Sequence, residues 1–196
     1  MADLEFFYDF VSPYSYLAST RVEAEVRRAG GTVRFRPFLL GGVFKATGNR
    51  APLETPAKLV HMWVDLQRWA RRLGVPFARP AAFPVLTVLP LRAALAAEKA
   101  GGLVPFTHAL YRAYWVEGRD VSQAEVVEDV ATRAGLDGPA LVAAAPSFKE
   151  ALARQTQEAV DRGAYGAPTF FVGGEMFVGN DRLEFAIEAL VAANRP

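Results

Sequence analysis

Residues 3–16 read DLEFFYDFVSPYSY, and this stretch decides the fold. Its first half, residues 3–9, is short and rich in aromatic side chains, which is typical of a buried β-strand. Its second half leads into a helical stretch that runs from about Pro13 to Arg28. Ser12 is of a type favoured at helix N-caps, and proline suits a first helical turn because its missing N–H would be unpaired there. The stretch therefore predicts a strand that passes directly into a helix.

The next segment extends this beginning into a strand–helix–strand unit. Gly30 and Gly31 close the predicted helix. From Thr32 to Pro37, apolar and charged residues alternate as they do in a strand. A strand, a helix and a second strand in this order favour a right-handed crossover and a parallel strand pair.

The middle and the end of the chain have different patterns. Residues from about 54 to 161 are mostly helical in character. Residues 169–172, a Gly-Gly pair and residues 175–178 predict a β-hairpin, and the apolar stripe within residues 183–191 predicts a closing helix. Three capping-box pairs predict helix starts: Ser122 with Glu125, Ser147 with Glu150, and Asp181 with Glu184.

Together these patterns predict an α/β protein with a thioredoxin-like fold and an all-helical insertion domain. We expect residues 1–40 and 164–196 to form the thioredoxin-like domain. Residues 41–163 would form the inserted helical domain.

The composition excludes several classes of protein. The chain has 196 residues, 52% of them hydrophobic, and 22 basic against 21 acidic side chains give a formal charge of +1. This balance gives no electrostatic case for a nucleic-acid partner. Because no apolar run reaches the roughly 18 residues of a membrane span, we expect no membrane partner either. Acidic residues near the N-terminus, where a secretory signal would have basic ones, favour a cytoplasmic protein.

Cysteine is absent, and His61 and His108 are the only histidines. The lack of cysteine excludes disulfides, thiolate zinc sites, iron–sulfur clusters and a thiol nucleophile belonging to the protein. With so few imidazoles, we expect no metal site.

Ser12 is the first candidate for chemistry because it lies where the predicted strand ends and the helix begins. Unpaired N–H groups and the positive end of the helix dipole favour an anion there. A serine hydroxyl can donate one more hydrogen bond to a thiolate. The simpler interpretation is an N-cap alone. Its position favours a function, since residues 12–15 fall where a thioredoxin-type protein would carry Cys-x-x-Cys.

Two further motifs lie towards the C-terminus. Residues 166–169, Gly-Ala-Pro-Thr, precede the predicted hairpin, where thioredoxin-like folds place a cis-proline facing the active-site helix. The alternative is an ordinary loop proline. Residues 179–182, Gly-Asn-Asp-Arg, open the last helix, where N–H groups can receive a carboxylate and Asp181 an ammonium group. The alternative is that Asp181 only caps the helix.

Four motifs occur together and in order, and as a set they resemble one family. The set comprises residues 9–18 (DFVSPYSYLA), 44–49 (FKATGN), 65–70 (DLQRWA) and 166–183 (GAPTFFVGGEMFVGNDRL). Over essentially the whole chain the sequence resembles the 2-hydroxychromene-2-carboxylate isomerase family, within the DsbA-like and kappa-class glutathione transferase group.

The resemblance implies an enzyme that depends on glutathione. Glutathione would be a cofactor recovered at each turnover, and its thiol would supply the sulfur that the chain lacks. The implied reaction converts 2-hydroxychromene-2-carboxylate into trans-o-hydroxybenzylidenepyruvate, a step in aromatic hydrocarbon degradation. In it the thiolate adds to the conjugated system, a single bond rotates, and the thiolate leaves.

The resemblance also assigns roles to individual residues. Ser12 would be the catalytic serine, which binds the glutathione sulfur. Ala167 and Pro168 would bind the cysteinyl part of glutathione, and Asn180 and Asp181 the γ-glutamyl end. The residues that would bind a small aromatic carboxylate substrate are Lys45, Asn49 and Arg50. The family also implies a homodimer.

One departure from the family concerns the substrate. Many relatives carry an Asn-Thr step after Phe83-Pro84, whereas this chain has Val-Leu-Thr at residues 85–87. Leu86 makes the predicted substrate pocket more apolar. Two alternatives therefore stay open: a kappa-class-type glutathione S-transferase acting on another aromatic electrophile, and a non-catalytic glutathione-binding module with a thioredoxin-like fold.

Overall fold

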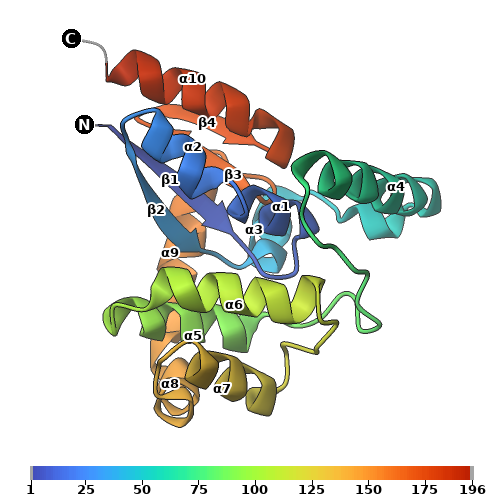
Figure 1. Cartoon of the computed structure of the whole chain (residues 1–196), viewed down its shortest axis with the longest axis vertical. Helices are drawn as coiled ribbons and strands as arrows, with labels where there is room; N and C mark the ends of the chain where they lie inside the picture. The colour runs from blue at the N-terminus through green and yellow to red at the C-terminus, as the bar shows by residue number, and fades with distance from the viewer. Residues whose placement is uncertain (1, 195–196) are drawn as a thin grey trace.

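The structure is a computed structural model, and it describes residues 2–194. Its four strands form one mixed sheet in the order β2-β1-β3-β4 (Figure 1). The strands are β1 (Asp3–Tyr8), β2 (Thr32–Pro37), β3 (Thr169–Val172) and β4 (Glu175–Val178). β1 pairs in parallel with β2 and antiparallel with β3, and β3 pairs antiparallel with β4. The predicted parallel pair and the C-terminal hairpin are both confirmed.

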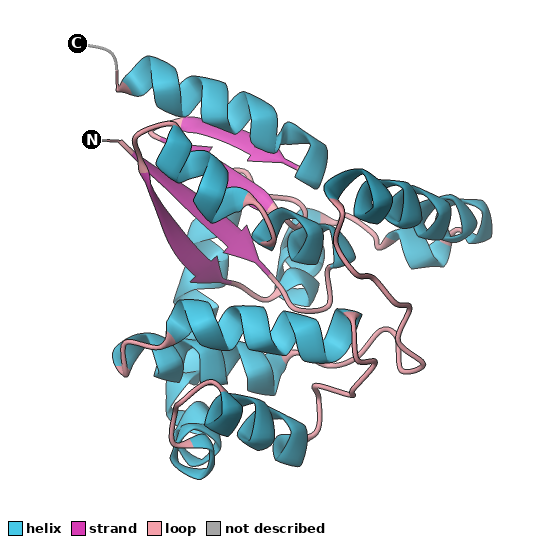
Figure 2. Ribbon diagram, in the orientation of Figure 1, coloured by secondary structure: helices cyan, strands magenta, loops and turns pink. Residues whose placement is uncertain are grey.

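Helices make up most of the rest of the described chain (Figure 2). The α-helices are α1 (Pro13–Ser19), α2 (Val22–Arg28), α3 (Leu40–Thr47), α4 (Pro56–Leu73), α5 (Val88–Lys99), α6 (Leu103–Trp115), α7 (Ala124–Arg133), α8 (Gly138–Ala144), α9 (Lys149–Asp161) and α10 (Leu183–Ala193). Three short 3-10 helices are η1 (Pro52–Glu54), η2 (Ala145–Phe148) and η3 (Asn180–Arg182). The prediction that residues 54–161 are mostly helical is confirmed.

The sheet is buried on both faces, because successive side chains of a strand point to opposite sides. Leu4, Phe6 and Tyr8 belong to the larger apolar core, which includes residues of α2, α6 and α10. Phe7 belongs to a second, smaller core with Phe171 and residues of α3 and α9. Figure 1 shows the same division, with α2 and α10 on one side of the sheet and α9 on the other. The end of β1 therefore lies deep in the protein.

The helices between β2 and β3 occupy two places (Figure 1). α5, α6, α7 and α8 pack on one another beside the β2 end of the sheet. α4 stands out to one side, where it contacts α1. The two ends of the described chain meet, since the amide of Ala2 donates to Asn194 Oδ1 at 2.7 Å. Within residues 2–194, no helix combines the length and the apolar character needed to cross a membrane.

The single helix predicted over residues 13–28 is in fact two helices, α1 and α2. At the break, the hydroxyls of Ser19 and Thr20 each donate to the carbonyl oxygen three residues earlier, at 2.7 Å. Such side-chain bonds to the backbone compete with the helical ladder and end the helix. α1 is therefore only seven residues long.

None of the three predicted capping boxes forms. α7, α9 and α10 each begin one residue later than the box requires, without a side-chain cap. The Ser122 hydroxyl instead bonds Asp120 Oδ1 at 2.6 Å, and the Ser147 hydroxyl donates to the Ala144 carbonyl at 2.7 Å. A turn precedes α7, and the 3-10 helices η2 and η3 run directly into α9 and α10, so each α-helix begins later than the capping box predicts. This also removes the simple capping interpretation of Asp181.

Candidate active site

A cavity of about 570 Å³ lies where the end of β1 meets α1, α3 and the loops around residues 83–88 and 165–167. Much of its wall is apolar and includes Leu39, Phe44, Leu53, Met62 and Phe83. The charged side chains that the described residues contribute to the wall are Asp9 and Arg50. A volume of this size with a few polar groups is typical of a small-molecule site.

Ser12 lies in this wall and is 4% exposed. Its Oγ accepts a hydrogen bond from the amide of Ser15 at 3.1 Å, so the predicted N-cap of α1 is confirmed. The same Oγ donates to the carbonyl oxygen of Ala167 at 3.0 Å. The structure thus brings the Ser12 motif into direct contact with residues 166–169.

Ala167 and Pro168 lie just before β3. The peptide bond between them is cis, as the fold type led us to expect. Ala167 is half-buried and lines the cavity, while Pro168 is buried. The carbonyl of Pro168 accepts a hydrogen bond from the amide of Gly179 at 2.9 Å. This bond places the third predicted motif, residues 179–182, next to the second.

Asn180 and Asp181 lie in η3, which contacts α1 but is not part of the cavity wall. Asn180 is buried, and Arg21 Nη2 donates to its carbonyl oxygen at 2.7 Å. Within the described part of the chain, Asn180 Nδ2 has no hydrogen-bond partner. Asp181 is half-exposed and pairs with Arg182 at 3.1 Å. A buried amide donor and an accessible carboxylate therefore stand side by side.

The three predicted substrate residues do not share one position. Lys45 is exposed on α3 and does not line the cavity. Asn49 and Arg50 do line it. Asn49 Nδ2 donates to the Tyr165 carbonyl at 2.7 Å, which ties the loop after α3 to the segment before Ala167. Arg50 pairs with Glu54 at 3.4 Å, but its side chain is 82% exposed and stays accessible.

Leu86 also lines the cavity, and 81% of its surface is exposed. It follows the second cis peptide, Phe83–Pro84, in a loop that leads into α5. An exposed leucine on a cavity rim offers apolar contact without a hydrogen bond. This agrees with the more apolar pocket predicted from the sequence.

Asp9 is a residue of the cavity to which the sequence analysis assigned no role. It is fully buried at the end of β1, and its carboxylate accepts hydrogen bonds from the amides of Leu40 at 2.8 Å and Val11 at 3.1 Å. Burial raises the pKa of Asp9 to about 6, although these bonds and the facing Thr87 hydroxyl act to lower it. The signal in the sequence that could have pointed to Asp9 is an acidic residue directly after the aromatic residues of a strand.

Tyr14 is a second such residue. It lines the cavity, and its hydroxyl donates to Asp65 Oδ2 at 2.9 Å, which connects α1 to α4. Burial, the hydrogen bond to Asp65 and the Asp65 charge raise the pKa of Tyr14, so the phenol stays protonated at neutral pH. Asp65 belongs to the motif at residues 65–70, whose role the spacing alone did not reveal.

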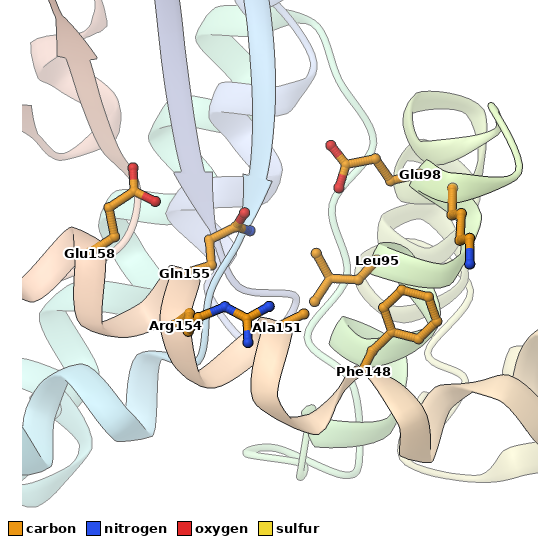
Figure 3. A pocket seen from close by; sticks show the side chains of 8 residues that line it. Leu95, Glu98, Phe148, Ala151, Arg154, Gln155 and Glu158 are labelled. Carbon is orange, nitrogen blue, oxygen red and sulfur yellow. The ribbon is translucent and has the colours of Figure 1, made fainter.

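A smaller depression of about 370 Å³ lies between α5 and α9 (Figure 3). Its cations, Lys99 and Arg154, are balanced by Glu98 and Glu158. None of the predicted site residues lines it. Among residues 2–194, moreover, no three acidic or histidine side chains are grouped to hold a metal ion. The cavity at Ser12 is therefore the candidate active site.

Known proteins resemble the chain over almost its full length. The family model described as a DsbA-like thioredoxin domain matches residues 3–191. A 2-hydroxychromene-2-carboxylate isomerase from Sphingobium xenophagum is 34% identical over 186 residues, which cover 93% of this chain and 94% of the relative. The chain belongs to the 2-hydroxychromene-2-carboxylate isomerase family of DsbA-like thioredoxin proteins.

Two further proteins place this family member among its neighbours. A solved structure of 2-hydroxychromene-2-carboxylate isomerase has a TM-score of 0.88 at 29% identity, covering 97% of this chain and 95% of that one. Glutathione S-transferase kappa 1 of Caenorhabditis elegans is 27% identical over 203 residues, covering 95% of this chain and 90% of that protein. The predicted thioredoxin-like fold is confirmed, and the chain's relatives carry the names of isomerases and glutathione transferases.

Proposed function

We propose that this family member is a glutathione-dependent isomerase that converts 2-hydroxychromene-2-carboxylate into trans-o-hydroxybenzylidenepyruvate. The observation that carries the proposal is the 3.0 Å hydrogen bond from Ser12 Oγ to the Ala167 carbonyl. It joins, on one cavity wall, the residues that the family resemblance assigns to the sulfur and to the cysteinyl part of glutathione. The names of the relatives support an isomerase of this substrate, and the product is the one that the family resemblance implies.

The chain's own polar groups suit glutathione. The buried, unpartnered Nδ2 of Asn180 calls for an acceptor, and a carboxylate of the γ-glutamyl end would supply one. The half-exposed carboxylate of Asp181 would receive the ammonium group. Ala167 would offer its backbone at the cavity edge. When bound, glutathione would supply a thiolate that adds reversibly to the conjugated substrate.

The Ser12 hydroxyl carries a single proton, which it donates to the Ala167 carbonyl in this structure. To bind the sulfur, Ser12 would turn this O–H away from the carbonyl, while the Ser15 amide keeps the oxygen in place. The released carbonyl would then accept an N–H of the cysteinyl residue. Because α1 has only seven residues, its dipole is small, and the Ser12 hydroxyl would give the main support to a bound thiolate.

The wall of the cavity suits an aromatic carboxylate. Apolar side chains such as Phe44 and Phe83 would cover a flat ring. Arg50 is the cation of the described wall, and its guanidinium would pair with the substrate carboxylate. Lys45, on the exposed side of α3, would act at longer range.

The test is the ultraviolet spectrum of 2-hydroxychromene-2-carboxylate mixed with the protein, with and without glutathione. We expect conversion to the open isomer only with glutathione, at an unchanged glutathione concentration. Ser12→Ala should remove most of the rate, and the matched control Ser15→Ala should keep it, since the Ser15 side chain does not line the cavity. Full conversion without glutathione would refute the proposal.

A kappa-class-type glutathione transferase is the second candidate, favoured by the relative from Caenorhabditis elegans. The exposed apolar side chain of Leu86 on the rim also suits electrophiles other than the bicyclic acid. A stable glutathione conjugate found by mass spectrometry, with glutathione consumed, would select this function. Glutathione binding without turnover of any aromatic acceptor would select a non-catalytic module.

We also propose that the protein is a cytoplasmic homodimer, as the family resemblance implies. α4 exposes Val60 and Val64, at 66% and 45% of their surface, and a second copy would cover such side chains. Analytical ultracentrifugation of the protein tests the dimer, and a monomer at micromolar concentration would contradict it.

A further inference from the structure

Asp9 is the one carboxylate in the described wall of the cavity, and it connects several parts of that wall. Its Oδ1 accepts the amide of Val11, which lies in the turn that leads to Ser12. Its Oδ2 accepts the amide of Leu40, the first residue of α3. Its backbone carbonyl also accepts the Ser12 amide at 3.0 Å.

The two segments that Asp9 connects, the Ser12 turn and the start of α3, lie at different ends of the cavity. The Ser12 turn lies at the proposed glutathione end, beside Ala167. α3 carries Phe44 and leads to Arg50, at the proposed substrate end. Thr87 lies directly before α5 and follows Leu86 in the loop on the cavity rim. Its hydroxyl also faces the Asp9 carboxylate.

The surroundings of Asp9 contain hydrogen-bond donors but no balancing cation. Among residues 2–194, no basic side chain forms an ion pair with it. The titratable side chains that surround it or share its cavity are Tyr8 on β1, Tyr14 on α1, Tyr111 and Tyr114 on α6, Arg50 after α3 and Tyr165 before β3. Burial raises the pKa of Tyr8, Tyr14, Tyr111 and Tyr114, so these phenols stay neutral. Asp9 is therefore the group here that titrates in the acid range.

Ionised Asp9 accepts both amides, whereas protonation places a hydrogen on one carboxyl oxygen and makes that oxygen a weaker acceptor for its amide. We propose that Asp9 is a positioning residue, whose ionised carboxylate holds the Ser12 turn and the start of α3 in register, so that sulfur and substrate meet. The proposal rests on the isomerase function proposed above. A buried carboxylate without a cationic partner destabilises the folded protein. A role in the active site would explain why the protein has one at this position.

The experiment has two arms, applied to the wild type, Asp9→Asn and Thr87→Val. In the first, NMR follows the amides of Val11 and Leu40 against pH, without glutathione. We expect both signals to titrate with a midpoint near pH 6 in the wild type. They should not titrate in Asp9→Asn, and in Thr87→Val the midpoint should rise, because a donor that favours the ionised form is lost.

In the second arm, kcat/KM for the aromatic substrate is measured against pH at saturating glutathione. The bound thiol gives every variant one acid limb, because the reaction uses its thiolate. We expect a second acid limb in the wild type, at lower pH, that shifts upwards in Thr87→Val and vanishes in Asp9→Asn. In Asp9→Asn, kcat/KM at neutral pH should fall about tenfold. Glutathione affinity should change less than about threefold, because its other proposed contacts, at Ala167, Asn180 and Asp181, are not held by the Asp9 carboxylate.

Each outcome decides between the claims. Amides that do not titrate in the wild type, or an Asp9→Asn protein with unchanged kcat/KM and both acid limbs, would overturn the proposal. Wild-type protein inactive at every pH with glutathione would overturn the proposed isomerase function instead, while the amide titration would still show whether Asp9 holds the two segments. If Asp9→Asn fails to fold, Thr87→Val alone decides, by whether the midpoint rises in both arms.

Discussion

Replacing Ser12 by alanine removes two hydrogen bonds of one buried hydroxyl. The cap from the Ser15 amide, at 3.1 Å, stabilises a helix start by about 1 kcal/mol. The bond to the Ala167 carbonyl, at 3.0 Å, contributes about 1 kcal/mol more. We therefore expect Ser12→Ala to lower the free energy of unfolding by about 2 kcal/mol, since the two bonds connect different segments.

The matched control is Ser15→Ala. The Ser15 hydroxyl is buried and faces the Tyr111 phenol without forming a well-shaped hydrogen bond. Its removal should change the free energy of unfolding by less than about 0.5 kcal/mol. Urea unfolding, followed by circular dichroism, measures both variants, and an unchanged m value shows that the same surface is exposed.

Equal effects of the two alanine variants would refute this reasoning, because only Ser12 has two partners. A loss below about 0.5 kcal/mol in Ser12→Ala would do the same. It would mean that the contact between residues 12 and 167 is not formed in solution.

Three other predictions follow from the site. Because Asp9 binds its proton more tightly when folded, with a pKa of about 6, the stability it contributes is present at low pH and lost as pH rises from about 4 to about 6. Relative to Asp9→Asn, the free energy of unfolding of the wild type should fall by about 3 kcal/mol over this pH range, as measured by urea unfolding. Arg50→Ala should raise KM for the aromatic carboxylate about three- to tenfold, and by more than Lys45→Ala does, because only Arg50 lines the cavity. Tyr14→Phe removes the 2.9 Å bond to Asp65, and amide exchange in α4 should speed up about tenfold; an unchanged exchange rate would show that this bond does not hold the helix.

Much of the fold was predictable because its signals are local. The aromatic run of β1, the alternation in β2 and the Gly-Gly turn of the hairpin each lie within a few residues of the structure they specify. The break after Ser19 was missed because apolar spacing continues through it, while the hydroxyl bonds that end the helix leave no such pattern. The helix starts were predicted one residue early, since a capping box does not reveal a preceding turn or 3-10 helix.

The part of the site that lies in the family motifs was predictable from the sequence. The family motifs led to Ser12 and Ala167, and the structure brings them into contact. The role of Asp9 was not predictable, because its environment is built by Leu40 and Thr87, which are distant in sequence. For the same reason the sequence did not separate Arg50, in the cavity wall, from Lys45 outside it.

The most direct test of the account is a titration of glutathione bound to the protein, followed by the ultraviolet absorbance of its thiolate. Free thiols of this type are mostly protonated at neutral pH, with a pKa of about 8.5. We expect the wild type and Ser15→Ala to lower the pKa of the bound thiol by at least about one unit. Ser12→Ala should bind glutathione without this shift. An unshifted thiol on the wild type, or an equal shift on Ser12→Ala, would contradict the claim that Ser12 holds the thiolate.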